Sequence, residues 1–341
     1  MPYGPLIVSV NGYHVSKDQE EARILQNAYV GGVILFSKNY QNVEQLKQLT
    51  SEIKDIAKDA NKDLMIMVDH EGGYVQRFRS GFSATPAAKV LGDIYDINPD
   101  TALKYANQLG KTVSRELKDV GVDIVLGPVV DLDAGNEVIS GLDRAYHSDP
   151  RVVSEIATAY VKGLETNGLH ATLKHFPGHG SVSGDSHLVE PTDNRPLEEI
   201  KLHDLIPFQN LIAENIIDAV MPAHVKYPII DSANTAGTSK IWLEDILRSE
   251  MNFDGVIISD CLSMTGAGSD SNLEKTKKAL EFGDLALLSN QTPHDYLQVL
   301  DTLQEQHFTW SVKSQHRVEA WLGMNQPENI LQAIPASEIV A

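Results

Sequence analysis

A short segment near the middle of the chain, KHFPGHGSVSGDSH, concentrates side chains that can carry protons. It contains Lys174, His175, His179 and His187, and one carboxylate, Asp185, lies two residues before the last histidine. Histidine is the one side chain whose ordinary pKa lies near neutrality, so such a cluster indicates proton transfer or metal binding. In an extended segment, residues two apart point to the same side, so Asp185 could orient His187 as a general acid/base. A polar turn without a catalytic role is the alternative.

The same side chains could instead bind a metal ion. His175 and His179 are four residues apart, a spacing that suits two ligands on one face of a helix. However, the residues between them are Phe-Pro-Gly, which interrupt a helix, and no cysteine accompanies them. We therefore expect no metal and no cofactor. A metallohydrolase, with Asp185 and His187 as further ligands, remains an alternative.

Carboxylates and guanidinium groups recur in other short polar motifs. Asp69 and Arg77 lie in VDHEGGYVQR, and Arg144 lies in GLDR. Asp accepts hydrogen bonds from sugar hydroxyls and Arg donates them, so these residues could bind a sugar. Asp260 ends the apolar run GVIIS, where a rigid element could hold it as a nucleophile. The alternatives are surface ion pairs for the first three residues and a helix N-cap for Asp260.

These candidate residues need elements that bring them together, and a repeating pattern along the chain supplies such elements. Short apolar runs rich in Val, Ile and Leu are typical of buried parallel strands. Helix-like stretches lie between them, with start signals such as Asn42 followed by Gln45, or Asp149 followed by Pro150. The predicted strands are 5–12, 31–39, 64–73, 122–132, 170–176, 219–225, 255–260 and 285–291.

Eight strands alternating with helices predict an α/β fold of the (β/α)8 TIM-barrel type. A polar residue ends or follows each run, and in such barrels the carboxyl ends of the strands meet on the face that carries the active site. A flavodoxin-like open sheet is the alternative, but no GxGxxG or GxxxxGK[ST] phosphate loop accompanies any strand. Without a linker, we expect one catalytic domain over 1–341, with a weakly ordered tail from about 325. The polar residues are Asn11, Asn39, Asp69, Asp131, Lys174 with His175, His224, Asp260 and Asn290.

Composition limits the partners and the compartment. The net charge of −19 argues against binding to nucleic acid or to anionic membranes. No apolar run approaches the roughly 18 residues of a transmembrane helix, and the opening MPYGPLIVSVNGY lacks the basic and small-residue features of a signal peptide. The single cysteine, Cys261, excludes an internal disulfide and fits a reducing compartment. We expect a monomeric, soluble, cytoplasmic protein with a small-molecule substrate.

Taken together, the motifs resemble those of glycoside hydrolase family 3, and specifically its single-domain bacterial β-N-acetylglucosaminidases. The resemblance extends over nearly the whole chain, through VDHEGGYVQR, DIVLGPVVDL, LKHFPGHG, DSH, MPAHVKYP and SDCLSM. KHFPGHG followed by DSH is a specific pair. It distinguishes this branch from the two-domain β-glucosidases of the family, whose acid/base carboxylate comes from a second domain.

The resemblance implies a retaining exo-hydrolase that removes terminal β-linked N-acetylglucosamine from N-acetylglucosaminyl-anhydro-muropeptides during cell-wall recycling. It makes Asp260 the nucleophile of a covalent glycosyl-aspartate intermediate, His187 the acid/base, and Asp185 its support. A non-catalytic sugar-binding protein is a further alternative, but it would not need Asp260 or the Asp185–His187 pair. The substrate-binding residues implied by the resemblance are Asp69, Arg77, Arg144, Lys174 and His175.

Overall fold

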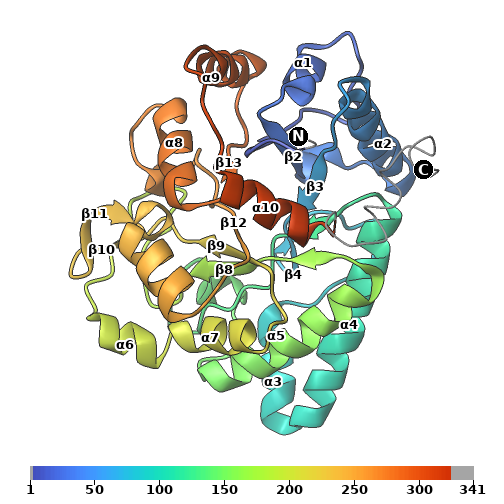
Figure 1. Cartoon of the computed structure of the whole chain (residues 1–341). Helices are drawn as coiled ribbons and strands as arrows, with labels where there is room; N and C mark the ends of the chain where they lie inside the picture. Colours follow the sequence, from blue (N-terminus) through green and yellow to red (C-terminus); the bar gives the residue numbers. More distant parts are fainter. Residues whose placement is uncertain (1–2, 324–341) are drawn as a thin grey trace, which may run out of the picture.

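The computed structural model describes residues 3–323 of the chain. Its centre is a parallel β-barrel, and helices surround it (Figure 1). The predicted tail, from about residue 325, lies outside the described residues. Across residues 3–323, no helix is both long and apolar enough to span a bilayer.

Eight parallel strands, with β7 and β8 counted as one, form the barrel wall in the described part of the chain. The fifth strand is interrupted at Thr172, so that β7 pairs with β6 and β8 pairs with β9. A parallel bridge from Ile258 to Leu285 connects β12 to β13, and β13 pairs with β1, which closes the barrel. Each predicted run corresponds to one of these strands, so the predicted (β/α)8 fold is confirmed. The strands are β1 (Leu6–Ser9), β2 (Val30–Leu35), β3 (Met65–Val68), β6 (Ile124–Val125), β7 (His170–Ala171), β8 (Leu173–Phe176), β9 (Ala219–Pro222), β12 (Val256–Ile257) and β13 (Ala286–Leu287).

Apart from the last two, which follow the last strand, the helices lie between the strands in sequence, and all but the last helix form the outer layer (Figure 1). Their start signals act as the sequence predicts: the Asn42 side chain accepts a hydrogen bond from the Gln45 amide, and Asp149 accepts one from the Arg151 amide. Besides short 3-10 turns, the helices are α1 (Glu20–Gln26), α2 (Val43–Asp59), α3 (Ala88–Ile97), α4 (Pro99–Asp119), α5 (Pro150–Leu164), α6 (Leu197–Leu202), α7 (Leu205–Ala213), the π-helix η5 (Ile241–Glu250), α8 (Asn272–Phe282), α9 (Pro293–Glu305) and α10 (Val312–Trp321). Two hairpins, β4 (His70–Gly72) with β5 (Val75–Gln76) and β10 (Lys226–Tyr227) with β11 (Asp231–Thr235), lie outside the barrel wall.

The apolar runs form barrel strands because their side chains are buried on both faces. Ile7 and Met67 belong to the apolar cluster inside the barrel, whereas the next residues along each strand, Val8 and Val68, belong to the cluster that also contains residues of the outer helices. Successive residues of a strand point to opposite faces, so a strand between two apolar layers is apolar throughout.

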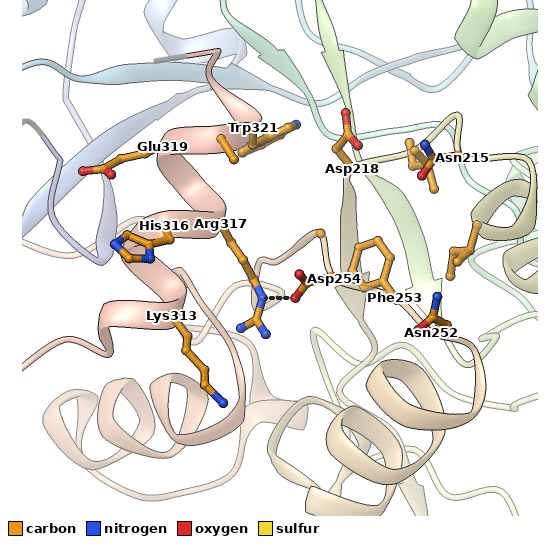
Figure 2. A pocket seen from close by; sticks show the side chains of 14 residues that line it. Asn215, Asp218, Asn252, Phe253, Asp254, Lys313, His316, Arg317, Glu319 and Trp321 are labelled. Atoms are coloured by element: carbon orange, nitrogen blue, oxygen red, sulfur yellow. Dashed lines mark hydrogen bonds and ion pairs between the residues drawn. The ribbon is translucent and has the colours of Figure 1, made fainter. Parts of the chain in front are cut away.

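Helix α10 packs against the amino-terminal end of the barrel. Trp310 and Trp321 join the apolar cluster of the barrel interior, and the Trp310 indole donates a 2.9 Å hydrogen bond to the carbonyl of Asp284, just before β13. Arg317 of α10 pairs with Asp254, which precedes β12, at 2.8 Å (Figure 2). These contacts seal the barrel core at this end, so the site-forming face is the opposite one, where the strands end.

Candidate active site

A cavity of about 290 Å³ opens at the carboxyl ends of the strands. Cavities for drug-sized ligands measure about 300–1,000 Å³, so this one suits a smaller ligand such as a single sugar ring. All eight site residues predicted from the sequence line it, although they come from distant parts of the chain. They are Asp69, Arg77, Arg144, Lys174, His175, Asp185, His187 and Asp260.

Lys174, on β8, is the centre of a charge network in this cavity. Its Nζ lies 2.8 Å from Oδ1 of Asp69 and 2.7 Å from Oε1 of Glu71, and its side chain is only 3% exposed. Arg77 binds the other oxygen of Asp69 at 3.1 Å. Burial alone would lower the pKa of Lys174, but the charges of Asp69 and Glu71 outweigh it and raise that pKa. Lys174 therefore remains a fixed positive charge and hydrogen-bond donor.

Glu71, on β4, is a cavity residue that the sequence analysis did not select. Its carboxylate accepts two hydrogen bonds from Arg144, from Nε at 2.8 Å and from Nη2 at 2.9 Å. Burial would raise the pKa of Glu71, but Arg144 and Lys174 hold it well below its usual range. The signal was available in the sequence, because Glu71 is two residues from Asp69 in the motif that also supplied Arg77.

His175 is held by Asp131, a second residue that the site prediction missed. The ring Nδ1 lies 2.7 Å from Oδ2 of Asp131, and the Oδ1 atom accepts hydrogen bonds from the amides of His175 and His179 at 3.1 and 2.8 Å. Burial would raise the pKa of Asp131, but His175 and His179 outweigh it and lower that pKa. An ionised Asp131 accepts a hydrogen bond from the N–H of His175 Nδ1, and this contact orients the His175 ring at the cavity wall. Asp131 was detectable as a strand-ending carboxylate in DIVLGPVVDL.

Asp185 and His187 form the expected pair, but in a turn and not in an extended segment, because the amides of Leu188 and Val189 both donate hydrogen bonds to the carbonyl of Asp185. Oδ1 of Asp185 accepts hydrogen bonds from the His187 amide at 2.9 Å and from the His187 Nδ1 at 2.8 Å. Burial would raise the pKa of Asp185, but the two hydrogen bonds and the charge of His187 outweigh it and lower that pKa. The His187 side chain is 68% exposed, and its Nε2 makes no hydrogen bond to any described residue. Nε2 is thus the nitrogen available to a ligand.

Asp260 follows β12 and lines the cavity. Its Oδ1 accepts a 2.7 Å hydrogen bond from the Cys261 amide. The alternative of a helix N-cap is wrong, because a turn follows Asp260 and the next α-helix, α8, is capped by Ser271 instead. One carboxylate oxygen of Asp260 is therefore anchored to the backbone at the end of a rigid strand.

His224, two residues after β9, supports the segment that carries Asp260. It is buried, and its Nε2 donates a 3.2 Å hydrogen bond to the carbonyl of Cys261. Burial lowers the pKa of His224, although the charge of Asp260 opposes the shift. A neutral ring with its proton on Nε2 fits this contact and fixes the backbone next to Asp260.

The hydrogen bonds of the cavity histidines are relevant to the alternative of a metal site. The Nδ1 atoms of His175 and His187 are each engaged by a carboxylate. Residues 3–323 contain no group of three or more His, Cys, Asp and Glu side chains arranged to hold a metal ion.

A larger cavity, of about 1050 Å³, lies at the other end of the barrel beside α10 (Figure 2). Side chains of both signs line it, among them Asp218, Asp254, Lys313 and Arg317, and none of the predicted site residues does. Size therefore does not identify the functional site here. In (β/α)8 enzymes the chemistry occurs at the carboxyl ends of the strands, where the smaller cavity lies.

Fold and site together place this protein among the (β/α)8-barrel enzymes. Comparison with known proteins narrows this class: residues 6–318 match the model of the glycosyl hydrolase family 3 N terminal domain. The chain belongs to glycosyl hydrolase family 3 and is a glycoside hydrolase. The non-catalytic alternative is thereby excluded.

Individual relatives support this assignment. A beta-hexosaminidase of Chromobacterium violaceum is 46% identical over 293 residues, which cover 85% of this chain and 80% of the relative. The crystal structure of NagZ from Neisseria gonorrhoeae in complex with N-trifluoroacetyl-D-glucosamine has a TM-score of 0.83 and 38% identity, and the match covers 97% of this chain and 96% of that one. NagZ has also been solved in complex with a zinc ion, with a TM-score of 0.82 at the same identity and coverage.

Proposed function

We propose that this protein is a retaining exo-β-N-acetylglucosaminidase of cell-wall recycling. Its substrates would be cytoplasmic N-acetylglucosaminyl-anhydro-muropeptides, from which it would remove the terminal β-linked sugar as a monomer. The observation that carries the proposal is the convergence of Asp260, the Asp185–His187 pair and five sugar-binding candidates on one cavity. The similarity to a beta-hexosaminidase, and to NagZ bound to an N-acylated glucosamine, supports the sugar specificity.

In the first step, a carboxylate oxygen of Asp260 attacks the anomeric carbon of the terminal sugar. The bond from that carbon to the glycosidic oxygen breaks, and Nε2 of His187 gives its proton to the departing oxygen. Asp185 binds the Nδ1 of the same ring at 2.8 Å, which directs Nε2 toward this role and stabilises the charged imidazolium. The product of this step is a glycosyl ester on Asp260 and a free leaving-group sugar.

In the second step, the neutral His187 removes a proton from a water molecule, which attacks the same anomeric carbon. The ester bond breaks and Asp260 returns to its carboxylate form. Two inversions at the anomeric carbon give net retention. An imidazole suits both roles because its ordinary pKa lies near neutral pH.

The charged residues of the cavity would hold the terminal sugar in place during both steps. Lys174 and Arg144 would donate hydrogen bonds to sugar hydroxyls, and Asp69 would accept them. Arg77 and His175, each bound to a carboxylate, would add further oriented donors. The ion pairs already present fix these groups before the substrate arrives, so little ordering remains to be done on binding.

The test uses matched substrates. The protein should hydrolyse an aryl β-N-acetylglucosaminide much faster than the corresponding β-glucoside, and NMR of the first-formed sugar should show the β-anomer. Incubation with an N-acetylglucosaminyl-anhydro-muropeptide should release N-acetylglucosamine. A preference for the glucoside, or an initial α-anomer, would contradict the proposal. Fractionation of cells and analytical ultracentrifugation would test the cytoplasmic location and the monomeric state.

A further inference from the structure

An exposed aromatic side chain stands at the cavity that holds the catalytic candidates. Tyr74 lines the same cavity as Asp260 and His187, yet it is 71% exposed. Its hydroxyl makes no hydrogen bond to any residue that the structure describes. An isolated exposed tyrosine is common on protein surfaces, but one at a sugar-sized cavity offers a flat apolar surface to a ligand that extends out of the cavity.

The backbone that carries Tyr74 is held firmly. Tyr74 lies in the turn of the β4–β5 hairpin, after Gly72 and Gly73, both of which have positive φ angles. A β-carbon on Gly72 would lie 2.3 Å from the carbonyl oxygen of Pro86, so the hairpin approaches the neighbouring segment too closely for a larger residue. Arg79 donates hydrogen bonds to the carbonyls of Gly73 and Tyr74 at 2.8 and 3.3 Å. The backbone of the hairpin is therefore fixed, while the side chain of Tyr74 is largely exposed and contributes little to packing.

The same hairpin also supplies the charged part of the cavity. Glu71, three residues before Tyr74, has a side chain that is only 6% exposed, and Arg77, three residues after it, pairs with Asp69. The charged groups suit the hydroxyls of the terminal sugar, whereas the aromatic ring suits the apolar face of a second ring. Because the cavity measures about 290 Å³, the rest of a disaccharide must extend past its mouth, where Tyr74 is exposed.

We propose that Tyr74 is the surface on which the leaving-group sugar of the substrate stacks. The C–H groups on one face of that sugar ring would cover the phenol ring while His187 protonates the oxygen between the two sugars. This inference rests on the proposed function and adds a specificity-determining residue for the leaving group. Tyr74 would thereby favour substrates whose leaving group is a sugar over those with a small leaving group.

The test compares two substrates that share the terminal sugar. In a β-linked N-acetylglucosamine disaccharide the leaving group is a sugar, whereas in β-N-acetylglucosaminyl fluoride the leaving group is a fluoride ion. Tyr74→Ala should lower kcat/KM for the disaccharide about 3- to 10-fold more than for the fluoride, on the scale of one lost aromatic contact. Most of the difference should be a higher KM. Tyr74→Phe keeps the ring and should recover most of the loss. The control is Tyr105→Ala on α4, since Tyr105 is 40% exposed but does not line the cavity, and this variant should match the wild type.

The possible outcomes separate the two proposals. Equal losses for both substrates would place the effect of Tyr74 on the terminal sugar or on the cavity itself and would overturn the inference. The absence of any loss in Tyr74→Ala would overturn it as well. If the wild-type protein cleaves neither N-acetylglucosaminide, the proposed function fails first, and the role of Tyr74 fails with it.

Discussion

Oδ1 of Asp185 binds both the amide and the Nδ1 of His187, at 2.9 and 2.8 Å. One carboxylate oxygen therefore fixes the backbone and the ring of the same residue. The ring is bound through only one nitrogen, and its other nitrogen is available to a substrate. Most retaining glycosidases use a second carboxylic acid, with a raised pKa, for the role that we propose for His187.

Replacement of Asp260 by asparagine should abolish turnover without unfolding the protein. The amide has nearly the shape of the carboxylate, and it can still accept the hydrogen bond from the Cys261 amide. It cannot form the glycosyl ester. Activity on an aryl N-acetylglucosaminide and thermal unfolding should be measured together. Residual activity above a few per cent of the wild type, after deamidation is excluded, would rule out Asp260 as the nucleophile.

His187→Ala should slow formation of the intermediate far more for a disaccharide than for a nitrophenyl glycoside. A nitrophenolate leaves without protonation, whereas a sugar oxygen needs the acid, whose help is typically worth about 10²–10⁴-fold. Hydrolysis of the intermediate should be slow with both substrates. With the nitrophenyl glycoside, whose first step stays fast, the glycosyl-enzyme should therefore accumulate, and azide should restore turnover. Mass spectrometry and single-turnover kinetics give the readout. Equal losses with no intermediate would exclude His187 as the acid/base.

Asp185→Asn should lower kcat/KM for a disaccharide more than for a nitrophenyl glycoside. The asparagine oxygen can still accept the hydrogen bond from the ring of His187, but the negative charge that favours the imidazolium is lost. Because the proposed first step needs a proton from His187, the loss should appear mainly with the disaccharide, whose leaving oxygen must be protonated. Asp185→Ala should add a loss of kcat, since the orienting contact disappears. An unchanged kcat/KM for the disaccharide in both variants would mean that Asp185 is not coupled to His187.

Glu71→Gln should lower the free energy of unfolding at pH 7 by about 3–5 kcal/mol, because Lys174 and Arg144 would lose a buried counter-charge. The pKa of Glu71 is lower in the folded protein than its usual value near 4.3. Its stabilising effect is therefore complete above that pH and is lost as the pH falls below it. Urea unfolding at several pH values should show a weaker acid dependence for the variant. Glu281→Gln, at an exposed residue, is the matched control.

Dialysis against a strong chelator should leave the activity unchanged. The helix-breaking Phe-Pro-Gly between His175 and His179 motivates this prediction, as do the carboxylates on His175 and His187. NagZ from Neisseria gonorrhoeae has been solved in complex with a zinc ion, so the test should include zinc as the metal that is returned. Activity should be measured after chelation and after zinc is returned. A loss that zinc restores would favour a metal-dependent reaction.

The sequence by itself determined the barrel and much of the site. Strands with both faces buried must be apolar throughout, so the eight runs were visible without any tertiary information. The order of strands and helices then predicted a closed barrel, and the polar residue at each strand end marked the face of the site. The Asp185–His187 contact was also predictable, because it is local in the chain.

Only the tertiary structure decided which charges neutralise one another. Glu71 and Arg144 are 73 residues apart in the chain, and Asp131 and His175 are 44 apart, so no local spacing could reveal either pair. Closure of the barrel brings the ends of β3, β6 and β8 together, and in this buried setting each cation needs a nearby carboxylate. The position of Tyr74 likewise depends on the tertiary fold, because the close packing of the β4–β5 hairpin sets which side chain is left exposed at the cavity.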